Sequence, residues 1–212
     1  MDGTQSRGAD NNCYELYFIR EDGLKLLLAG LGETQWYGLF SEANGSANRI
    51  LADLYQNGVI DWEGAGAAVR QPYAGMLAAM LEKKTCVTIQ LPDPAAPVRC
   101  CYLSRTGMIM TQKSRREDRT LGMAKLSAKS WLELLEEECA RLDDGESCLL
   151  TRRSSKDGQV QATIRICRDG LRSYRMESDT GPARLVCCDR EAFGNRLREM
   201  LQADEVTGRY MH

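Results

Sequence analysis

Histidine is almost absent from this chain of 212 residues, which carries a single one, His212, at the last position. A terminal imidazole is not held in a fixed geometry, so the sequence excludes a histidine general base and a Cys-His nucleophile. A zinc site would then need four cysteines, and none of the nine cysteines forms a CxxC pair. We therefore predict no catalytic constellation, no cofactor and no bound metal.

Long apolar runs are also missing. No stretch approaches the roughly 18 apolar residues that span a bilayer, and the polar residues 1–12 lack the apolar core of a secretory signal. The formal net charge of −2 creates no global field that would attract nucleic acid or an anionic membrane. We expect a cytoplasmic protein without membrane insertion, with a disordered tail at residues 1–12 and with reduced cysteines.

Two pairs of adjacent cysteines, Cys100-Cys101 and Cys187-Cys188, lie in apolar runs. Neighbouring side chains on a strand point to opposite faces of the sheet. This alternation argues against joint metal ligation by either pair, and a buried free thiol packs as a small hydrophobe.

Residues 13–84 are predicted to be mainly helical. Apolar residues recur at helical spacing in segments 24–31, 47–56 and 72–82. The glycine-rich stretch 63–68 resembles half of a nucleotide-binding fingerprint, but it lacks the third glycine and a proper preceding strand. We interpret it as a flexible turn.

Beyond residue 84 the apolar period changes from 3.6 to 2. Residues 85–142 predict four strands and a helix, and residues 147–202 predict the same order. The two segments align at an offset of 62 or 63 residues, through the pairs Cys86/Cys148, Gly107/Gly170, Ser127/Asp189, Trp131/Phe193 and Leu135/Leu197. This favours an internal duplication of a ββββα unit with antiparallel sheets. The alternative is two unrelated meanders that each end in a helix.

The two segments close their first hairpins with different chemistry. One has a rigid proline loop and the other a basic turn, which suggests an asymmetric surface on a symmetric frame. The candidate partner-binding residues are Pro92, Asp93 and Pro94 in the first segment and Arg152, Arg153 and Lys156 in the second.

Paired carboxylates occur at Glu136 and Glu137, on the predicted helix after the fourth strand. We interpret them as a solvated helix face. An enzyme that uses carboxylates or cysteine without histidine stays open as a third possibility.

Residues 47–84, with a helix, a turn and a short extended piece, resemble part of a winged-helix domain. A DNA-binding surface needs phosphate-neutralising cations. Residues 42–82 contain only Arg49 and Arg70, against five acidic residues. A regulatory or nucleic-acid-binding domain is therefore the alternative function, and nucleic acid is not the favoured partner.

The whole order of elements resembles the EspG family, the cytosolic chaperones of type VII secretion substrates. The resemblance covers roughly residues 15–201 and rests on the stretches LADLYQNGVIDWEG, YAGMLAAMLEKK, CVTIQL and TLGMAKLSAKSWLELL. It implies an α+β fold with two subdomains related by a pseudo-twofold axis, without cofactor or catalysis. It also implies binding to the helical tip of an exported partner through a hairpin and C-terminal helices.

The sequence thus predicts an α+β protein in which a helical N-terminal region precedes two tandem ββββα units. The function that it favours is a non-enzymatic protein-interaction module, a chaperone or adaptor. The expected partner is a secreted helical protein or a second copy of the chain.

Overall fold

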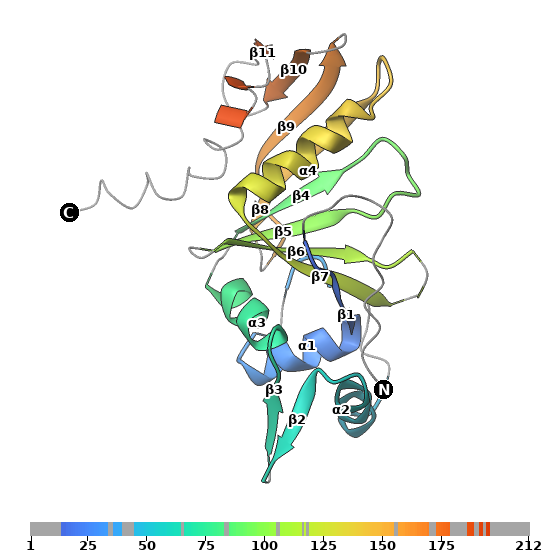
Figure 1. Cartoon of the computed structure of the whole chain (residues 1–212), viewed down its shortest axis with the longest axis vertical. Coiled ribbons are helices and arrows are strands. Elements are labelled where there is room, and N and C mark those ends of the chain that lie inside the picture. Colours follow the sequence, from blue (N-terminus) through green and yellow to red (C-terminus); the bar gives the residue numbers. More distant parts are fainter. Residues whose placement is uncertain are drawn as a thin grey trace, which may run out of the picture.

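The chain folds around one large sheet with helices on both faces, as a computed structural model shows (Figure 1). The predicted tail at residues 1–12, the thiol of Cys13 and the helix residues Phe193 and Leu197 lie outside the described residues. The structure describes residues 14–33, 36–39, 45–64, 66–82, 85–104, 107–115, 117, 119–154, 157–169, 173–178, 186–188, 191–192 and 194–195.

The sheet is antiparallel, with the strand order β1-β7-β6-β5-β4-β8-β9-β10-β11. Strands β4 to β7 follow one another as a first meander, and β8 to β11 follow one another as a second. The strands are β1 (Tyr17–Arg20), β4 (Thr85–Gln90), β5 (Arg99–Ser104), β6 (Gly107–Lys113), β7 (Thr120–Leu126), β8 (Ser147–Ser154), β9 (Val160–Asp169), β10 (Ser173–Ser178) and β11 (Val186–Cys188). The period-2 pattern beyond residue 84 therefore predicted strands correctly.

The first strands of the two meanders, β4 and β8, pair with each other at the centre of the sheet. Thr88 lies opposite Thr151 in this ladder, and Thr88 Oγ1 donates a hydrogen bond of 3.2 Å to the carbonyl of Thr151. Both threonines are buried. The two meanders are thus one continuous sheet rather than two separate sheets.

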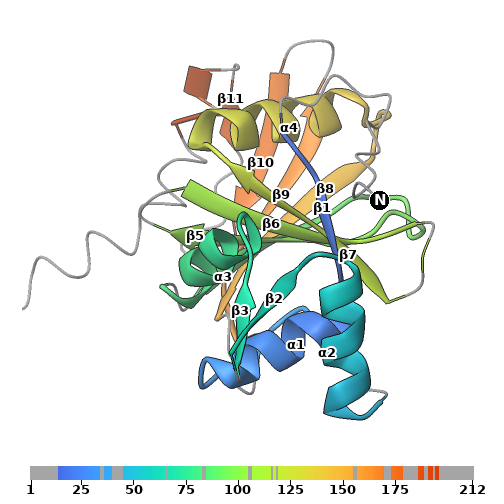
Figure 2. The ribbon, with the colours of Figure 1, turned by 60° about the horizontal axis from the view of Figure 1, so that its bottom comes forward.

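Helices cover the two faces of the sheet in separate groups (Figures 1 and 2). Helix α4 (Ala128–Ala140) buries Trp131 and Leu135 against one face, which we call the α4 face. Helices α1 (Glu21–Gly30), α2 (Ala47–Gln56) and α3 (Tyr73–Leu81) gather on the opposite side, which we call the α1–α3 face. A two-stranded sheet of β2 (Ile60–Glu63) and β3 (Gly66–Val69) accompanies them.

Adjacent cysteines show the alternation that separates the two cores. Cys101 packs in the core beneath α4, whereas Cys100 packs in the core beneath α1–α3. The prediction that Cys100 and Cys101 face opposite sides is confirmed, because successive side chains of a strand alternate.

The two ends of α4 are held by side chains from different parts of the chain. Ser127 caps the first turn by accepting a hydrogen bond of 3.0 Å from the amide of Ser130. At the other end, Arg168 of β9 donates hydrogen bonds of 3.0 Å to the carbonyls of Ala140 and Leu142. These carbonyls have no partner within the helix, so an arginine of the second meander completes the helix of the first.

The N-terminal region contains three helices but is less uniformly helical than the sequence predicted. Tyr17–Arg20 forms β1, which pairs with β7 at the edge of the large sheet. Gly66–Val69, predicted as part of a flexible turn, forms β3 and pairs with β2. Four-residue strands are too short for a clear period, and their pairing is decided by the partner strand.

No helix in the described ranges is long and apolar enough to cross a bilayer. The same ranges contain no group of three or more His, Cys, Asp or Glu side chains placed to hold a metal ion.

Candidate interaction surfaces

The proline loop leaves the end of β4 and is open to solvent. Pro92, Asp93 and Pro94 are all exposed. The Asp93 carboxylate accepts a hydrogen bond of 2.8 Å from the amide of Ala95, and the Asp93 carbonyl accepts one of 3.0 Å from Ala96. The loop therefore keeps a defined turn through its own hydrogen bonds, and Pro92 and Pro94 are accessible to a partner.

The basic pair of the second meander lies in a strand and not in the turn. Arg152 and Arg153 belong to β8, where they pair with Val87 and Cys86 of β4. The tight turn comes later, where the amide of Gly158 donates a hydrogen bond of 3.1 Å to the carbonyl of Ser154. The third predicted residue, Lys156, lies outside the described residues. Arg152 and Arg153 were assigned to the turn wrongly because the pairing with β4 extends β8 beyond the apolar part of its sequence.

Arg153 has contacts within the protein. Its guanidinium lies 5.3 Å from the centroid of the Tyr37 ring, and its Nη1 donates a hydrogen bond of 3.2 Å to the carbonyl of Gly158. The carbonyl of Tyr37 in turn accepts a hydrogen bond of 2.7 Å from the hydroxyl of Tyr102. Arg153 thus helps to hold the segment 36–39 against the sheet.

The two predicted hairpin surfaces do not come together. In the antiparallel β4–β8 pair, Gln90 lies opposite Leu149 and Thr85 lies opposite Ser154. The proline loop follows Gln90, whereas the β8–β9 turn follows Ser154, at the other end of the ladder. A ladder of this length spans about 17 Å. One partner could contact both hairpins only by reaching across the sheet.

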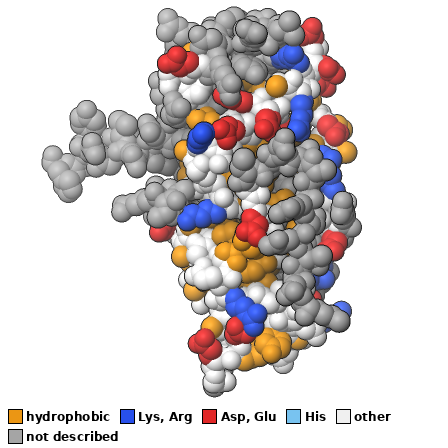
Figure 3. Space-filling model, viewed as in Figure 1, with side chains coloured by type: hydrophobic (Ala, Val, Ile, Leu, Met, Phe, Trp, Pro, Cys, Tyr) orange, Lys and Arg blue, Asp and Glu red, His pale blue; other side chains and the backbone are white. Residues whose placement is uncertain are grey.

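An apolar hollow lies between α2 and β2, at the end of the molecule away from β10. We call it the α2–β2 groove; its volume is about 340 Å³. Figure 3 shows hydrophobic side chains gathered over these two elements at the lower end of the view. Tyr55 and Trp62 are 48% and 51% exposed, which is unusual for aromatic side chains. The lining residues are Asn48, Leu51, Ala52, Tyr55, Gln56 and Trp62.

The helical spacing of segment 47–56 did not reveal the groove. Ile50 and Leu54 are buried, with Leu54 against Gly23 of α1, whereas Tyr55 is exposed. The apolar residues of α2 follow one another too closely for the helical period to separate the two faces. The exposed Trp62, which follows α2 by only a few residues, was the available signal.

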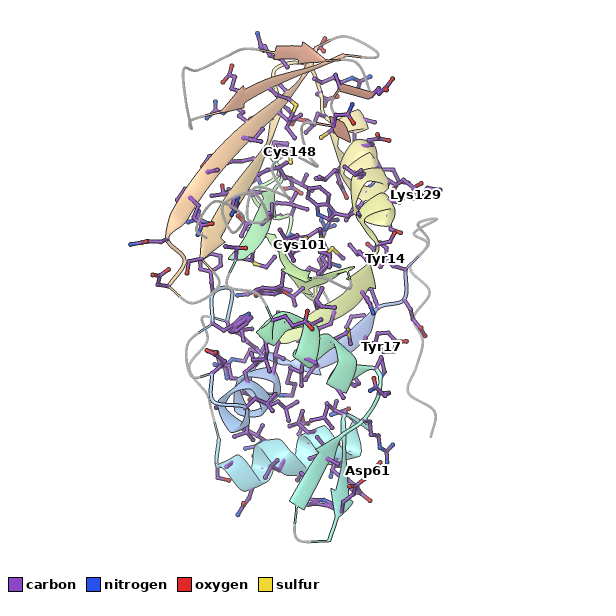
Figure 4. All side chains as sticks on the ribbon, turned by 90° about the vertical axis from the view of Figure 1, so that its left-hand side faces the viewer. Tyr14, Tyr17, Asp61, Cys101, Lys129 and Cys148 are labelled. Atoms are coloured by element: carbon purple, nitrogen blue, oxygen red, sulfur yellow. The ribbon has the colours of Figure 1, made fainter. Side chains whose placement is uncertain are left out.

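Charged residues near the groove are of both signs. Asp61 of β2 forms an ion pair with Arg70. The hydrogen bond that Arg70 donates in this pair lowers the pKa of the Asp61 carboxyl. Asp61 lies at the far lower end of the molecule in Figure 4. One of the two cations of this region is therefore already paired with a carboxylate.

The buried thiols of the sheet are poor nucleophiles. Burial raises the pKa of Cys100 and of Cys101 to about 12 each, from an ordinary value of 9.0. Burial also raises the pKa of Cys86, and the hydrogen bond with Cys148 raises that of Cys139. Because the thiolate is the reactive form, these four side chains do not support cysteine chemistry near neutral pH.

No protein-family model matches the chain, and no curated protein matches it.

Proposed function

We propose that this chain is a non-enzymatic protein-interaction module with an EspG-like order of elements, which acts as a cytosolic chaperone or adaptor for a secreted helical protein. The observation that carries the proposal is the α2–β2 groove, in which Leu51, Tyr55 and Trp62 form an apolar surface open to solvent. An amphipathic helix can lay its apolar face into such a groove. Aromatic side chains are also the residues that most often dominate binding energy at protein interfaces.

The proposal includes an internal duplication of residues 85–142 and 147–202. Two observations support it. Both segments begin with a strand of the central β4–β8 pair, and both continue as antiparallel meanders. An antiparallel pair of equivalent strands has a local twofold relation, which agrees with the pseudo-twofold implied by the EspG resemblance.

A nucleic-acid-binding role fits the α2–β2 region less well. The order α2, β2, β3 does place a hairpin after a helix, as a winged helix would. The exposed face of α2, however, presents Tyr55 to solvent beside the partly buried Leu51, and Arg70 is paired with Asp61. A phosphate backbone needs several free cations, and an apolar aromatic groove gives it none.

The test is affinity capture from a native lysate of the source organism, with identification of partners that bind in stoichiometric amounts. The groove variant is Tyr55→Ser with Trp62→Ser, which changes the two exposed aromatic side chains of the groove. A matched control is Val160→Ser, which removes a 52% exposed apolar side chain from the other part of the molecule. A second variant replaces residues 92–97 by Gly and Ser.

We expect the wild type and Val160→Ser to capture a secreted helical protein, and the groove variant to lose it while keeping its melting temperature. Loss of capture by the proline-loop variant would assign that loop to the same interface. Equal capture by the groove variant and the wild type would contradict the proposal. A salt-sensitive shift with duplex DNA, lost in the groove variant, would replace it by the nucleic-acid alternative.

A further inference from the structure

Three arginines of the second meander share one face of the sheet. Residues that lie opposite each other in an antiparallel ladder point to the same side. Arg153 is opposite Cys86, whose side chain packs in the core beneath α1–α3. The same register places Arg165, opposite Leu149, and Arg175, opposite Cys167, on this α1–α3 face.

Over the second meander this face carries no helix in the described part of the chain. The cores beneath α1, α2 and α3 are built on β1 and β4 to β7, and α4 packs on the opposite face. In Figure 4, α4 with Lys129 lies to the right of β9, the α1–α3 group lies below, and the left side of β9 has no described helix over it. Arg165 and Arg175 therefore have no described helix above them, whereas Arg153 lies against the Tyr37 ring of segment 36–39.

The guanidinium groups on this face have few acceptors, the carbonyl of Gly158 for Arg153 being the one described. Neither Arg165 nor Arg175 forms a hydrogen bond or ion pair with any described residue. The Nε atoms of Arg153 and Arg175 are buried without an acceptor. Leaving a buried N–H without a partner costs stability, so the arrangement favours an incoming acceptor.

The arginines of the α4 face have more acceptors around them. Arg99 donates to Gln112 and pairs with Glu138, although its Nη1 is also buried without an acceptor, and Arg168 donates to two carbonyls at the end of α4. On the opposite face of the second meander the only described carboxylate is Glu177, directly opposite Arg165, so three cations face one anion.

We propose that this face, which we call the arginine face, binds an acidic segment of a partner protein through Arg153, Arg165 and Arg175. Carboxylates are acceptors that match the fork of a guanidinium, and they would satisfy the unpaired N–H groups. Arg165 and Arg175 are diagonal neighbours about 7 Å apart, and Arg153 lies about 14 Å further along the strands. Carboxylates in successive turns of a helix or along an extended peptide can meet this spacing.

A nucleic acid is a poorer match for the arginine face. Single strands bind on platforms in which bases stack on aromatic rings. The described side chains between the arginines are Leu149, Thr151 and Thr163, and none of them is aromatic. The chain as a whole has a net charge of −2, so the positive charge is local to this face.

The arginine face uses neither the α2–β2 groove nor the proline loop, and it shares only Arg153 with the candidate partner-binding residues of the hairpins. The variants that test it change Arg165 and Arg175 alone. The two ideas can therefore succeed or fail separately.

The experiment measures binding of fluorescein-labelled poly-L-glutamate to the full chain by fluorescence anisotropy at low and at high salt. The test variant is Arg165→Ala with Arg175→Ala, and the charge-preserving variant is Arg165→Lys with Arg175→Lys. The matched control is Lys129→Ala, which removes a cation that is 85% exposed on α4. Thermal melting checks that every variant is folded.

We expect saturable binding that weakens as salt rises, a loss of affinity of about tenfold in the double alanine variant, and near wild-type affinity in the lysine variant and in Lys129→Ala. No binding by the wild type at low salt, or equal binding by the double alanine variant, would refute the proposal. It would also fail if a single-stranded oligothymidylate bound more tightly than poly-L-glutamate, or if the wild type self-associated through this face and excluded the probe.

Discussion

The carboxylate of Glu138 in α4 and the guanidinium of Arg99 in β5 form an ion pair with an N–O distance of 2.8 Å, and both side chains are largely buried. Arg99 also donates a hydrogen bond of 3.0 Å from Nε to Gln112 of β6. The pair ties the only helix on the α4 face, within the described residues, to the middle of the first meander.

Removing one partner of this pair should be costly. In Glu138→Ala the guanidinium of Arg99 stays buried without its anion, and we expect a loss of about 3 kcal/mol in the free energy of unfolding. The control is Glu137→Ala, because Glu137 is exposed on the next position of the same helix. Urea unfolding of both variants measures the difference, and equal stabilities would show that the ion pair contributes nothing.

Two glycines with positive φ separate backbone strain from steric collision. Gly158 (φ 72°) and Gly145 (φ 89°) both occupy the left-handed region. A Cβ at Gly158 would collide with the Tyr37 ring and lie 2.7 Å from its Cε2, whereas a Cβ at Gly145 would meet open space.

We therefore expect Gly145→Ala to lose about 1 kcal/mol of stability, from backbone strain alone. Gly158→Ala should lose about 2 kcal/mol or more, because Tyr37 must also move away from Arg153. Urea unfolding measures both losses. A similar loss in the two variants would mean that the contact between Tyr37 and the β8–β9 turn is loose.

The buried thiols predict the direction of the alkaline pH dependence. The pKa of Cys100 and of Cys101 is raised to about 12 by burial, so the native chain keeps both protons up to that pH. The unfolded chain loses these protons near pH 9, the ordinary value. Between these limits the unfolded state binds fewer protons, so the stability that is complete below pH 9 decreases as the pH rises towards 12.

Urea unfolding at about pH 7 and about pH 10 tests this direction. The comparison protein is Cys100→Ala with Cys101→Ala, in which the decrease between the two values should be smaller. The double variant has a lower stability at both values because of the lost packing, so the slope and not the absolute stability is compared. An unchanged slope would assign the alkaline decrease to other groups.

An element is predicted from the sequence more reliably when more of its residues follow the apolar spacing of a strand or a helix. The strands from β4 to β9 each extend over six or more residues, so their extended apolar segments gave a clear signal. The helix α2 was also placed correctly, because its helical spacing is local.

The features that were missed depend on tertiary contacts. The strand Tyr17–Arg20 gains its conformation from pairing with β7, and the position of Arg153 in β8 depends on pairing with β4. The exposure of Tyr55 depends on which side of α2 packs against α1. None of these can be read from spacing along the chain.

The proposed duplication makes a prediction about two aromatic side chains. Trp131 is fully buried in the core beneath α4, and Trp131→Ala should lose about 3 to 5 kcal/mol. Phe193 is its counterpart at an offset of 62 residues in the sequence. If residues 85–141 and 147–202 are copies, Phe193→Ala should lose a comparable amount, which urea unfolding measures. An experimental structure in which Trp131 and Phe193 hold unrelated positions on their meanders would contradict the duplication.

The pairing of β4 with β8 has a consequence for a chain cut in two. The turn Asp143–Glu146 that joins the meanders is largely exposed, so a protease could reach it. After cleavage, the six residue pairs between Thr85–Gln90 and Leu149–Ser154 would still hold the pieces together. The hydrogen bond from Arg168 to the carbonyl of Ala140 at the end of α4 would also remain. Either piece produced alone would expose β4 or β8 as an unpaired edge strand, which can pair with a strand of another chain. The β4–β8 ladder thus keeps the two meanders associated even when the peptide link between them is cut.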